Sequence, residues 1–205
     1  MTEFTIHQPP FVIAFGSAKP HRKTMKDGRT GMMNNEILER FAYCPVCGSK
    51  HFDQQNFKSK KCQNCGFEYY TNPSAATAAF IINNEGQLLV LTRKKEPAKG
   101  TLDLPGGFCD IGETLEQGIR REVKEETGLI VDKAEYLFSF PNKYRYSNLD
   151  IPTLDAFFRC EVSDLSPLHA MDDAAKAQWI SLNNIRTELF GLRSIRQALF
   201  EFTKL

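Results

Sequence analysis

Three glutamates within one predicted helix have the spacing of a binding site for a divalent metal ion. Glu122, Glu125 and Glu126 stand at positions i, i+3 and i+4, so a helix would present them within an arc of about 100°. Three like charges on one face destabilise a bare helix, whereas a hard divalent cation such as Mg²⁺ lying over them would neutralise them. Such an ion keeps water molecules that can be activated for attack on a phosphorus atom. The alternative is a charged helix that faces solvent.

The residues around these glutamates suit the same chemistry. Arg121 precedes Glu125 by four residues, so it can pair with that carboxylate and fix its orientation. The tight turn Pro105-Gly106-Gly107 lets the backbone pass close to the carboxylates. A carbonyl oxygen of this turn could therefore complete the coordination of the metal ion.

Four cysteines form two CxxC pairs, Cys44 with Cys47 and Cys62 with Cys65, and each pair is followed by glycine. Two such turns can supply the four tetrahedral thiolates that Zn²⁺ prefers, so we predict a zinc ribbon rather than a redox pair or disulfides. Four thiolates leave no open position, and the zinc is expected to be structural. Around the ribbon, a solvated basic face with a small core is the simplest interpretation, with nucleic-acid or oligomer contact as alternatives.

Composition narrows the class of protein. The chain has 205 residues, of which 41% are hydrophobic and 25% charged, with a net charge of +1. These values exclude a wholly disordered chain, and no apolar run is long enough to span a bilayer. The near-zero net charge gives no reason to expect a polyanion-binding protein. The N-terminus lacks the pattern of a signal peptide, so we expect a cytosolic protein without a membrane partner.

The sequence pattern divides the chain into three parts. They are an irregular arm or leader (1–34), the zinc ribbon (35–73) and one α/β domain (74–205) that must position the glutamates. A helix is predicted over 115–127, with Thr114 and Gln117 as a capping box and Gly128 as its stop. A second amphipathic helix is predicted over 194–202. Strands are predicted over 74–82, 87–92, 134–140, 154–162 and 178–182.

The stretch 107–129 resembles the signature of the Nudix hydrolase family. The matching residues are Gly107, Glu113, Arg121-Glu122-Val123, Glu125-Glu126 and Gly128-Leu129. The resemblance implies an α/β/α sandwich and hydrolysis of a nucleoside diphosphate linked to another moiety. It also implies that Glu122, Glu125 and Glu126 bind Mg²⁺ or Mn²⁺, that the Gly106 carbonyl is a ligand, and that Glu113 has a supporting role. The general base varies within the family, between a glutamate of the signature and a later acidic residue.

The zinc ribbon before this domain is similar to that of the NADH pyrophosphatase group, and so is the aromatic lead 67–73. The group's downstream motif SQPWPFPxS is matched only in part by 139–147, where Ser139, Pro141 and Ser147 agree. The match implies a dinucleotide pocket and leaves NADH preference open.

The residues that replace the rest of that motif are Lys143, Tyr144 and Arg145. We expect them on a loop, where they could stack on a base and hold phosphates. A solvated hairpin loop is the alternative.

The resemblance further implies a metal ligand at Asp173, which precedes Trp179 by six residues. The alternative is that Asp172 or Asp173 caps a helix that begins at Ala174. Trp179 itself is expected to pack in the core.

The sequence therefore predicts a metal-dependent hydrolase of pyrophosphate bonds that acts on a small nucleotide, such as NADH or an ADP-ribose-like compound. Nucleoside triphosphates or nucleotide sugars are the alternative substrates. A protein that only senses a ligand or binds nucleic acid is the rival class. Hydrolysis of a nucleotide cap on RNA would combine hydrolysis with nucleic-acid binding. A homodimer is left open.

Overall fold

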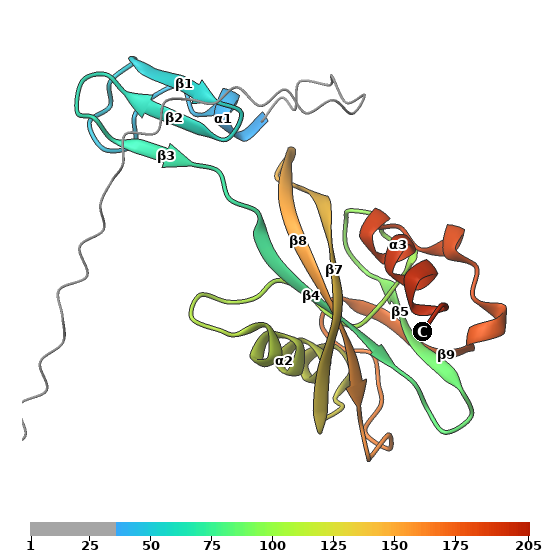
Figure 1. Ribbon diagram of the computed structural model, residues 1–205. Coiled ribbons are helices and arrows are strands. Elements are labelled where there is room, and N and C mark those ends of the chain that lie inside the picture. The colour runs from blue at the N-terminus through green and yellow to red at the C-terminus, as the bar shows by residue number, and fades with distance from the viewer. Residues whose placement is uncertain (1–35) are drawn as a thin grey trace, which may run out of the picture. The chain divides into compact units, whose positions relative to one another are not determined.

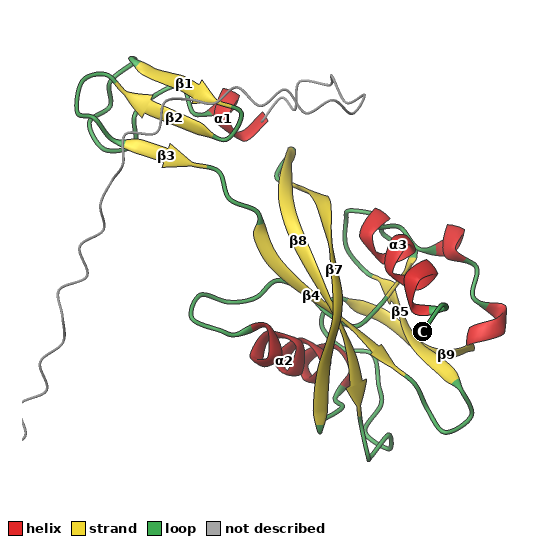
Figure 2. Ribbon diagram, in the orientation of Figure 1, coloured by secondary structure: helices red, strands yellow, loops and turns green. Residues whose placement is uncertain are grey.

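The computed structural model describes residues 36–205, and the arm predicted over 1–34 lies outside the described residues. Figure 1 shows the chain coloured from its N-terminus to its C-terminus, and Figure 2 shows its helices and strands. Within the described part of the chain, no helix is long and apolar enough to cross a membrane.

The cysteine-rich segment forms a short helix followed by a small antiparallel sheet. Helix α1 spans Glu36–Arg40, and strands β1 (Phe52–Asn56), β2 (Ser59–Cys62) and β3 (Glu68–Tyr70) pair in the order β1-β2-β3. The buried side chains of its core are Cys44, Phe52 and Cys62. Such a small core supplies little hydrophobic free energy, so this segment needs a further source of stability.

The remaining strands form two three-stranded sheets. One has the order β4 (Ser74–Ile81), β8 (Leu149–Glu161), β7 (Lys133–Tyr146), and its β4 and β8 run parallel. The other has the order β6 (Leu102–Asp103), β5 (Gln87–Arg93), β9 (Ala174–Ser181), and it is antiparallel. Helices α2 (Leu115–Thr127) and α3 (Arg193–Phe202), with two 3-10 turns (Leu182–Asn184 and Thr187–Leu189), complete the fold.

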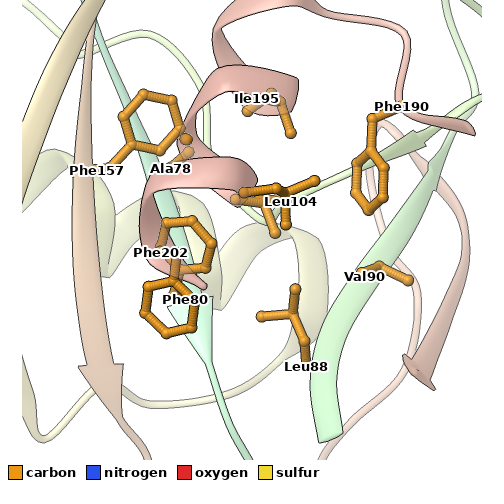
Figure 3. Packing of buried hydrophobic residues seen from close by; sticks show 11 residues of the cluster. Ala78, Phe80, Leu88, Val90, Leu104, Phe157, Phe190, Ile195 and Phe202 are labelled. Atoms are coloured by element: carbon orange, nitrogen blue, oxygen red, sulfur yellow. The ribbon is translucent and has the colours of Figure 1, made fainter. Parts of the chain in front are cut away.

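Strand β4 divides the core between the two helices. Because side chains alternate along a strand, Ala78 and Phe80 join the cluster that includes α3, while Ala79 and Ile81 join the cluster that includes α2. The rings of Phe80 and Phe202 stack at 4.0 Å and fasten α3 to this strand (Figure 3). Figure 1 accordingly shows α2 and α3 on opposite sides of β4. This is the predicted α/β/α arrangement.

Helix α2 has the predicted bounds because its signals are local. Thr114 and Gln117 form both hydrogen bonds of a capping box, and Gly128 ends the helix in the left-handed conformation at a φ of 74°. Helix α3 begins one residue before the predicted start, and its buried face carries the predicted Ile195 and Leu199. The helix that bears the glutamates is therefore fixed at both ends.

The loop predicted around Lys143, Tyr144 and Arg145 is wrong. These residues belong to β7, whose register pairs them with β8 as far as Tyr146 opposite Leu149. The connection consists of Ser147 and Asn148, with φ values of 48° and 61°. Two consecutive positive φ values are those of a type I′ hairpin turn, which continues both strands to the very end.

The helix cap considered at Asp172 and Asp173 is also wrong. The residues after Asp173 form strand β9, which pairs antiparallel with β5. As expected, Trp179 of this strand packs against the cluster on the α2 side.

Candidate active site and thiolate metal site

The four paired cysteines converge on one point. Their sulfur atoms all lie within 4.8 Å of one another, and none forms a disulfide. The Sγ atoms of Cys44 and Cys65 are 3.7 Å apart, and those of Cys47 and Cys62 are 3.6 Å apart. A tetrahedron with metal–sulfur bonds of about 2.3 Å has edges of about 3.8 Å. The four thiols therefore fit one closed tetrahedral metal site.

The two halves of this site have the same backbone geometry. Gly48 N–H donates to the Cys44 carbonyl at 2.9 Å, and Gly66 N–H donates to the Cys62 carbonyl at 2.9 Å. Both glycines have positive φ values, 71° and 77°, which explains why glycine follows each pair.

One thiol of the site is predisposed to lose its proton. The Asn64 amide donates to Cys47 Sγ at 3.6 Å, and this hydrogen bond is the main reason why the pKa of the Cys47 thiol falls to about 6. A thiolate is the form that binds a metal ion.

The three glutamates of α2 line a second site, a cavity of about 310 Å³. Their side chains differ in exposure: Glu126 is buried, Glu122 is 16% exposed and Glu125 is 48% exposed. Among residues 36–205, one group of three or more histidine, cysteine, aspartate or glutamate side chains could hold a metal ion with its ligand atoms as they stand. That group is the four cysteines. The three glutamates thus share one cavity, but they are not part of such a group.

The Gly106-Gly107 turn lies directly against these carboxylates. Gly106 N–H donates to Glu126 Oε2 at 2.9 Å. A Cβ atom on Gly107 would lie 2.7 Å from the Glu122 carboxylate, and one on Gly106 would lie 2.1 Å from the Thr77 carbonyl oxygen. A larger residue at Gly106 would require the backbone to move, and a larger residue at Gly107 would displace the Glu122 carboxylate. The role of the Gly106 carbonyl as a metal ligand stays a prediction.

Arg121 donates hydrogen bonds to three of the carboxylates. It donates to both oxygens of Glu113 at 2.8 Å, to Glu122 Oε1 at 2.8 Å and to Glu125 Oε2 at 3.0 Å. It also donates to the Phe108 carbonyl at 2.9 Å. The predicted pair with Glu125 is confirmed, whereas the bonds to Glu113 and Glu122 were not foreseen. Because of Arg121, the pKa of the Glu113 carboxyl falls to about 2.

Burial has the opposite effect on Glu126. Desolvation is the main cause that raises the pKa of its carboxyl from 4.5 to about 8, and nearby acidic groups that include Asp103, Glu122 and Asp173 add to it. A cation bound at this site would favour the ionised form.

We therefore expect Glu126→Gln to stabilise the protein at alkaline pH when magnesium and manganese are absent. Because the folded pKa of about 8 exceeds the ordinary 4.5, the contribution of this carboxyl to stability is complete below 4.5 and is lost as the pH rises through 8. Glutamine does not ionise and can still accept the Gly106 N–H bond. The Tm of the variant should exceed that of the wild type by at least roughly 5 °C near pH 9 and should match it near pH 5. A difference that does not change with pH would contradict this expectation.

Asp172 and Asp173 line the same cavity from the turn just before β9. Asp173 forms an ion pair with Lys95, and Lys94 Nζ donates to the Asp172 carbonyl at 3.1 Å. The structure thus brings Asp173 to the cavity of the glutamates, as the metal-ligand prediction requires.

The three residues predicted to contact the substrate separate into two groups. Tyr144 lines the cavity, whereas Lys143 and Arg145 are not among the residues that line it. The alternation of side chains along β7 explains the difference, because Asn142 and Tyr144 point to the face opposite that of Lys143 and Arg145. Arg145 bonds to Asp150 at 2.8 Å.

Four further polar residues that line the cavity were missed from the sequence. They are Arg93, Asp103, Asn142 and Asp155, which come from β5, β6, β7 and β8. The signal that could have found two of them is an aspartate inside an apolar run, at Leu102-Asp103-Leu104 and at Leu154-Asp155-Ala156. A buried carboxylate in such a run needs polar partners or a ligand.

Comparisons with known proteins agree with this geometry. A family model described as NUDIX domain matches residues 72–201. An ADP-ribose pyrophosphatase of Methanocaldococcus jannaschii is 36% identical over 121 residues, which cover 58% of this chain and 68% of that protein. An NAD-capped RNA hydrolase NudC of Haemophilus influenzae is 27% identical over 176 residues, which cover 84% of this chain and 64% of that protein. This chain thus matches less than two thirds of the length of the NudC relative.

Solved structures have the same fold. A NUDIX hydrolase from Nitrosomonas europaea matches with a TM-score of 0.63 at 22% identity, over 79% of this chain and 90% of that one. A bifunctional NMN adenylyltransferase/ADP ribose pyrophosphatase from Francisella tularensis matches with a TM-score of 0.51 at 26% identity, over 66% of this chain and 42% of that one.

Proposed function

The chain belongs to the Nudix family, and we propose that it hydrolyses the pyrophosphate bond of a dinucleotide-like substrate, such as an ADP-ribose compound or NADH. One observation carries this proposal. The glutamates of α2, the Gly106-Gly107 turn and Asp173 surround one cavity, whose size is at the lower end of those that hold small ligands.

In the proposed site, Glu122, Glu125 and Glu126 hold Mg²⁺ or Mn²⁺, and Asp173 and the Gly106 carbonyl complete the ligand set. When bound, such ions neutralise phosphate oxygens and lower the pKa of the attacking water. Arg121 positions two of the glutamates through the bonds described above. A carboxylate of this set would accept a proton of the water as its oxygen bonds to one phosphorus. The bond from that phosphorus to the bridging oxygen breaks, and a nucleoside monophosphate and the phosphorylated second moiety leave as products.

We propose Zn²⁺ as the ion of the four-thiolate site. Its role is structural, because four thiolates fill the tetrahedral shell and leave no position for a substrate. The small core of this segment supports the same role, since the bound metal supplies the free energy that such a core lacks.

Hydrolysis of a dinucleotide cap on RNA is the second candidate. It is favoured by the NudC relative, whose 176 aligned residues extend beyond the stretch 72–201 and so include part of the chain outside the NUDIX match. The bond that is hydrolysed would again be the pyrophosphate bond of the dinucleotide. The net charge of +1 gives RNA no general attraction, and for this reason the small dinucleotide comes first.

Three further predictions accompany this proposal. The cytosolic location still rests on the paired cysteines, and the homodimer has no further support. Nucleoside triphosphates and nucleotide sugars remain the alternative substrates of the same chemistry.

A protein that only binds its ligand would have no need of three acidic side chains around one cavity, which argues for an enzyme.

A substrate panel tests the proposed function. The zinc-loaded protein would be incubated with Mg²⁺ or Mn²⁺ and with NADH, NAD⁺, ADP-ribose, nucleotide sugars, nucleoside triphosphates and an NAD-capped oligoribonucleotide. We expect strong hydrolysis of an ADP-ribose compound or a nicotinamide dinucleotide. Preference for triphosphates would overturn the substrate class, and silence across the panel would overturn the hydrolase.

A further inference from the structure

One side-chain amide faces the cavity in a fixed orientation. Asn142 of β7 and Asp155 of β8 both line the cavity, and Asn142 Nδ2 donates to Asp155 Oδ2 at 3.0 Å. The two residues are diagonal neighbours, because the strand register places Asn142 opposite Thr153 and Phe140 opposite Asp155.

The fixed orientation comes from Asp155, which acts only as an acceptor. Asp155 is 7% exposed, and its carboxylate also accepts from the hydroxyl groups of Thr153 at 2.6 Å and Ser194 at 2.5 Å. Since a carboxylate offers only acceptors to its neighbours, the amide of Asn142 must turn its nitrogen towards Asp155. A flipped amide would bring two oxygens together, which is costly in a buried site.

Consequently the bond to Asp155 fixes which side of the Asn142 amide is nitrogen and which is oxygen. The carbonyl oxygen and the second N–H are then left for a ligand in the cavity. No hydrogen bond within residues 36–205 uses that carbonyl oxygen. An acceptor beside a donor matches the edge of adenine, where the 6-amino group lies beside a ring nitrogen that accepts. In a 6-oxo purine the 6-substituent is an acceptor instead, so the same arrangement would face oxygen with oxygen.

Other side chains that line the cavity suit the faces of a planar base. Phe108 lines the cavity, is 38% exposed, and contacts the ring of Tyr144 edge to face at 5.2 Å. The Tyr144 hydroxyl is bonded to Arg93 at 3.0 Å, which restrains that ring. Apolar Leu104 and Ile195 also line the cavity. Aromatic and apolar walls with one polar group are typical of base-binding pockets.

We propose that Asn142, held by Asp155, binds the amino edge of an adenine base and makes the site selective for adenine nucleotides over 6-oxo purine nucleotides. The inference rests on the proposed function for the presence of an adenine nucleotide, and it adds which residues select the base. Asn142 determines specificity, and Asp155 is its positioning residue.

Calorimetric binding of AMP and IMP in the presence of Mg²⁺ tests this proposal without any turnover. A well-placed pair of hydrogen bonds discriminates by roughly 1–3 kcal/mol, so the wild type should bind AMP about tenfold to a hundredfold more tightly than IMP. The Asn142→Ala variant should lose this preference. The Asp155→Asn variant, in which the amide is free to flip, should also move the ratio towards one. The Asn184→Ala variant changes the same residue type at an exposed position of a 3-10 turn and should keep the wild-type ratio.

Equal affinity of the wild type for both nucleotides, or no binding of either, would overturn the inference. So would an Asn142→Ala variant that is folded by circular dichroism and keeps the preference for AMP. Failure of the proposed function gives a different pattern, in which AMP is bound selectively but the substrate panel shows no hydrolysis.

Discussion

The Glu125→Gln variant is expected to lose turnover by roughly a thousandfold or more and to remain folded. A carboxylate that holds a catalytic metal ion contributes several kcal/mol of transition-state stabilisation, and each 1.36 kcal/mol is worth about a factor of ten. The side chain is 48% exposed and bonds within α2 to Arg121 at 3.0 Å. Its removal should therefore cost less than about 1 kcal/mol of stability. Values of kcat on the best substrate, together with Tm, measure both effects.

A matched control lies on the same helix. Glu116 is exposed in the first turn of α2, away from the cavity, so Glu116→Gln makes the same chemical change without touching the proposed metal site. Its kcat should equal that of the wild type. Normal kcat in Glu125→Gln would remove this residue from the metal site, and a comparable loss in Glu116→Gln would show that charge on the helix is the cause.

The Cys62→Ser variant is expected to lose its zinc and to unfold the segment around it. Cys62 is fully buried, and it belongs to both the ligand set and the small hydrophobic cluster of this segment. Structural zinc in small domains contributes roughly 10–16 kcal/mol at neutral pH, far more than such a core can replace. Metal analysis should fall from one zinc per chain to near zero, and amide protection should vanish in β1–β3.

The control for this variant is Cys109→Ser, a change at a cysteine that is not part of the four-thiolate cluster. It should keep one zinc per chain. Retention of a full zinc equivalent by Cys62→Ser would show that the ligand set is wrong. Loss of amide protection across α2 and β4–β9 in Cys62→Ser would contradict a role confined to the N-terminal segment.

Local signals explain which elements could be predicted from the sequence. The bounds of α2 follow from Thr114, Gln117 and Gly128, each of which acts within one turn of the helix. The ends of β7 and β8 could not be read in the same way, because Ser147 and Asn148 adopt the positive φ values of the turn without a glycine. The basic residues before them then suggested a loop.

The residues of the site also divide into those marked by local spacing and those brought together only by the fold. The glutamates of α2 could be grouped from their spacing because a helix fixes the distance between neighbours three and four residues apart. Arg93, Asn142 and Asp155 stand on three different strands, and only the register of the sheets brings them to one cavity. Glu113 was assigned a supporting role, but its partner Arg121 lies eight residues away and could be identified only from the structure.

Hydrolysis of ADP-ribose in heavy-oxygen water is the most direct test of a metal-dependent attack by water on a pyrophosphate bond. Mass spectrometry of the products should find AMP and ribose 5-phosphate in equal amounts, with one heavy oxygen on one of the two phosphates, only when Mg²⁺ or Mn²⁺ is present. Absence of these products with zinc-loaded, folded protein, or their formation at the same rate without either ion, would contradict the account.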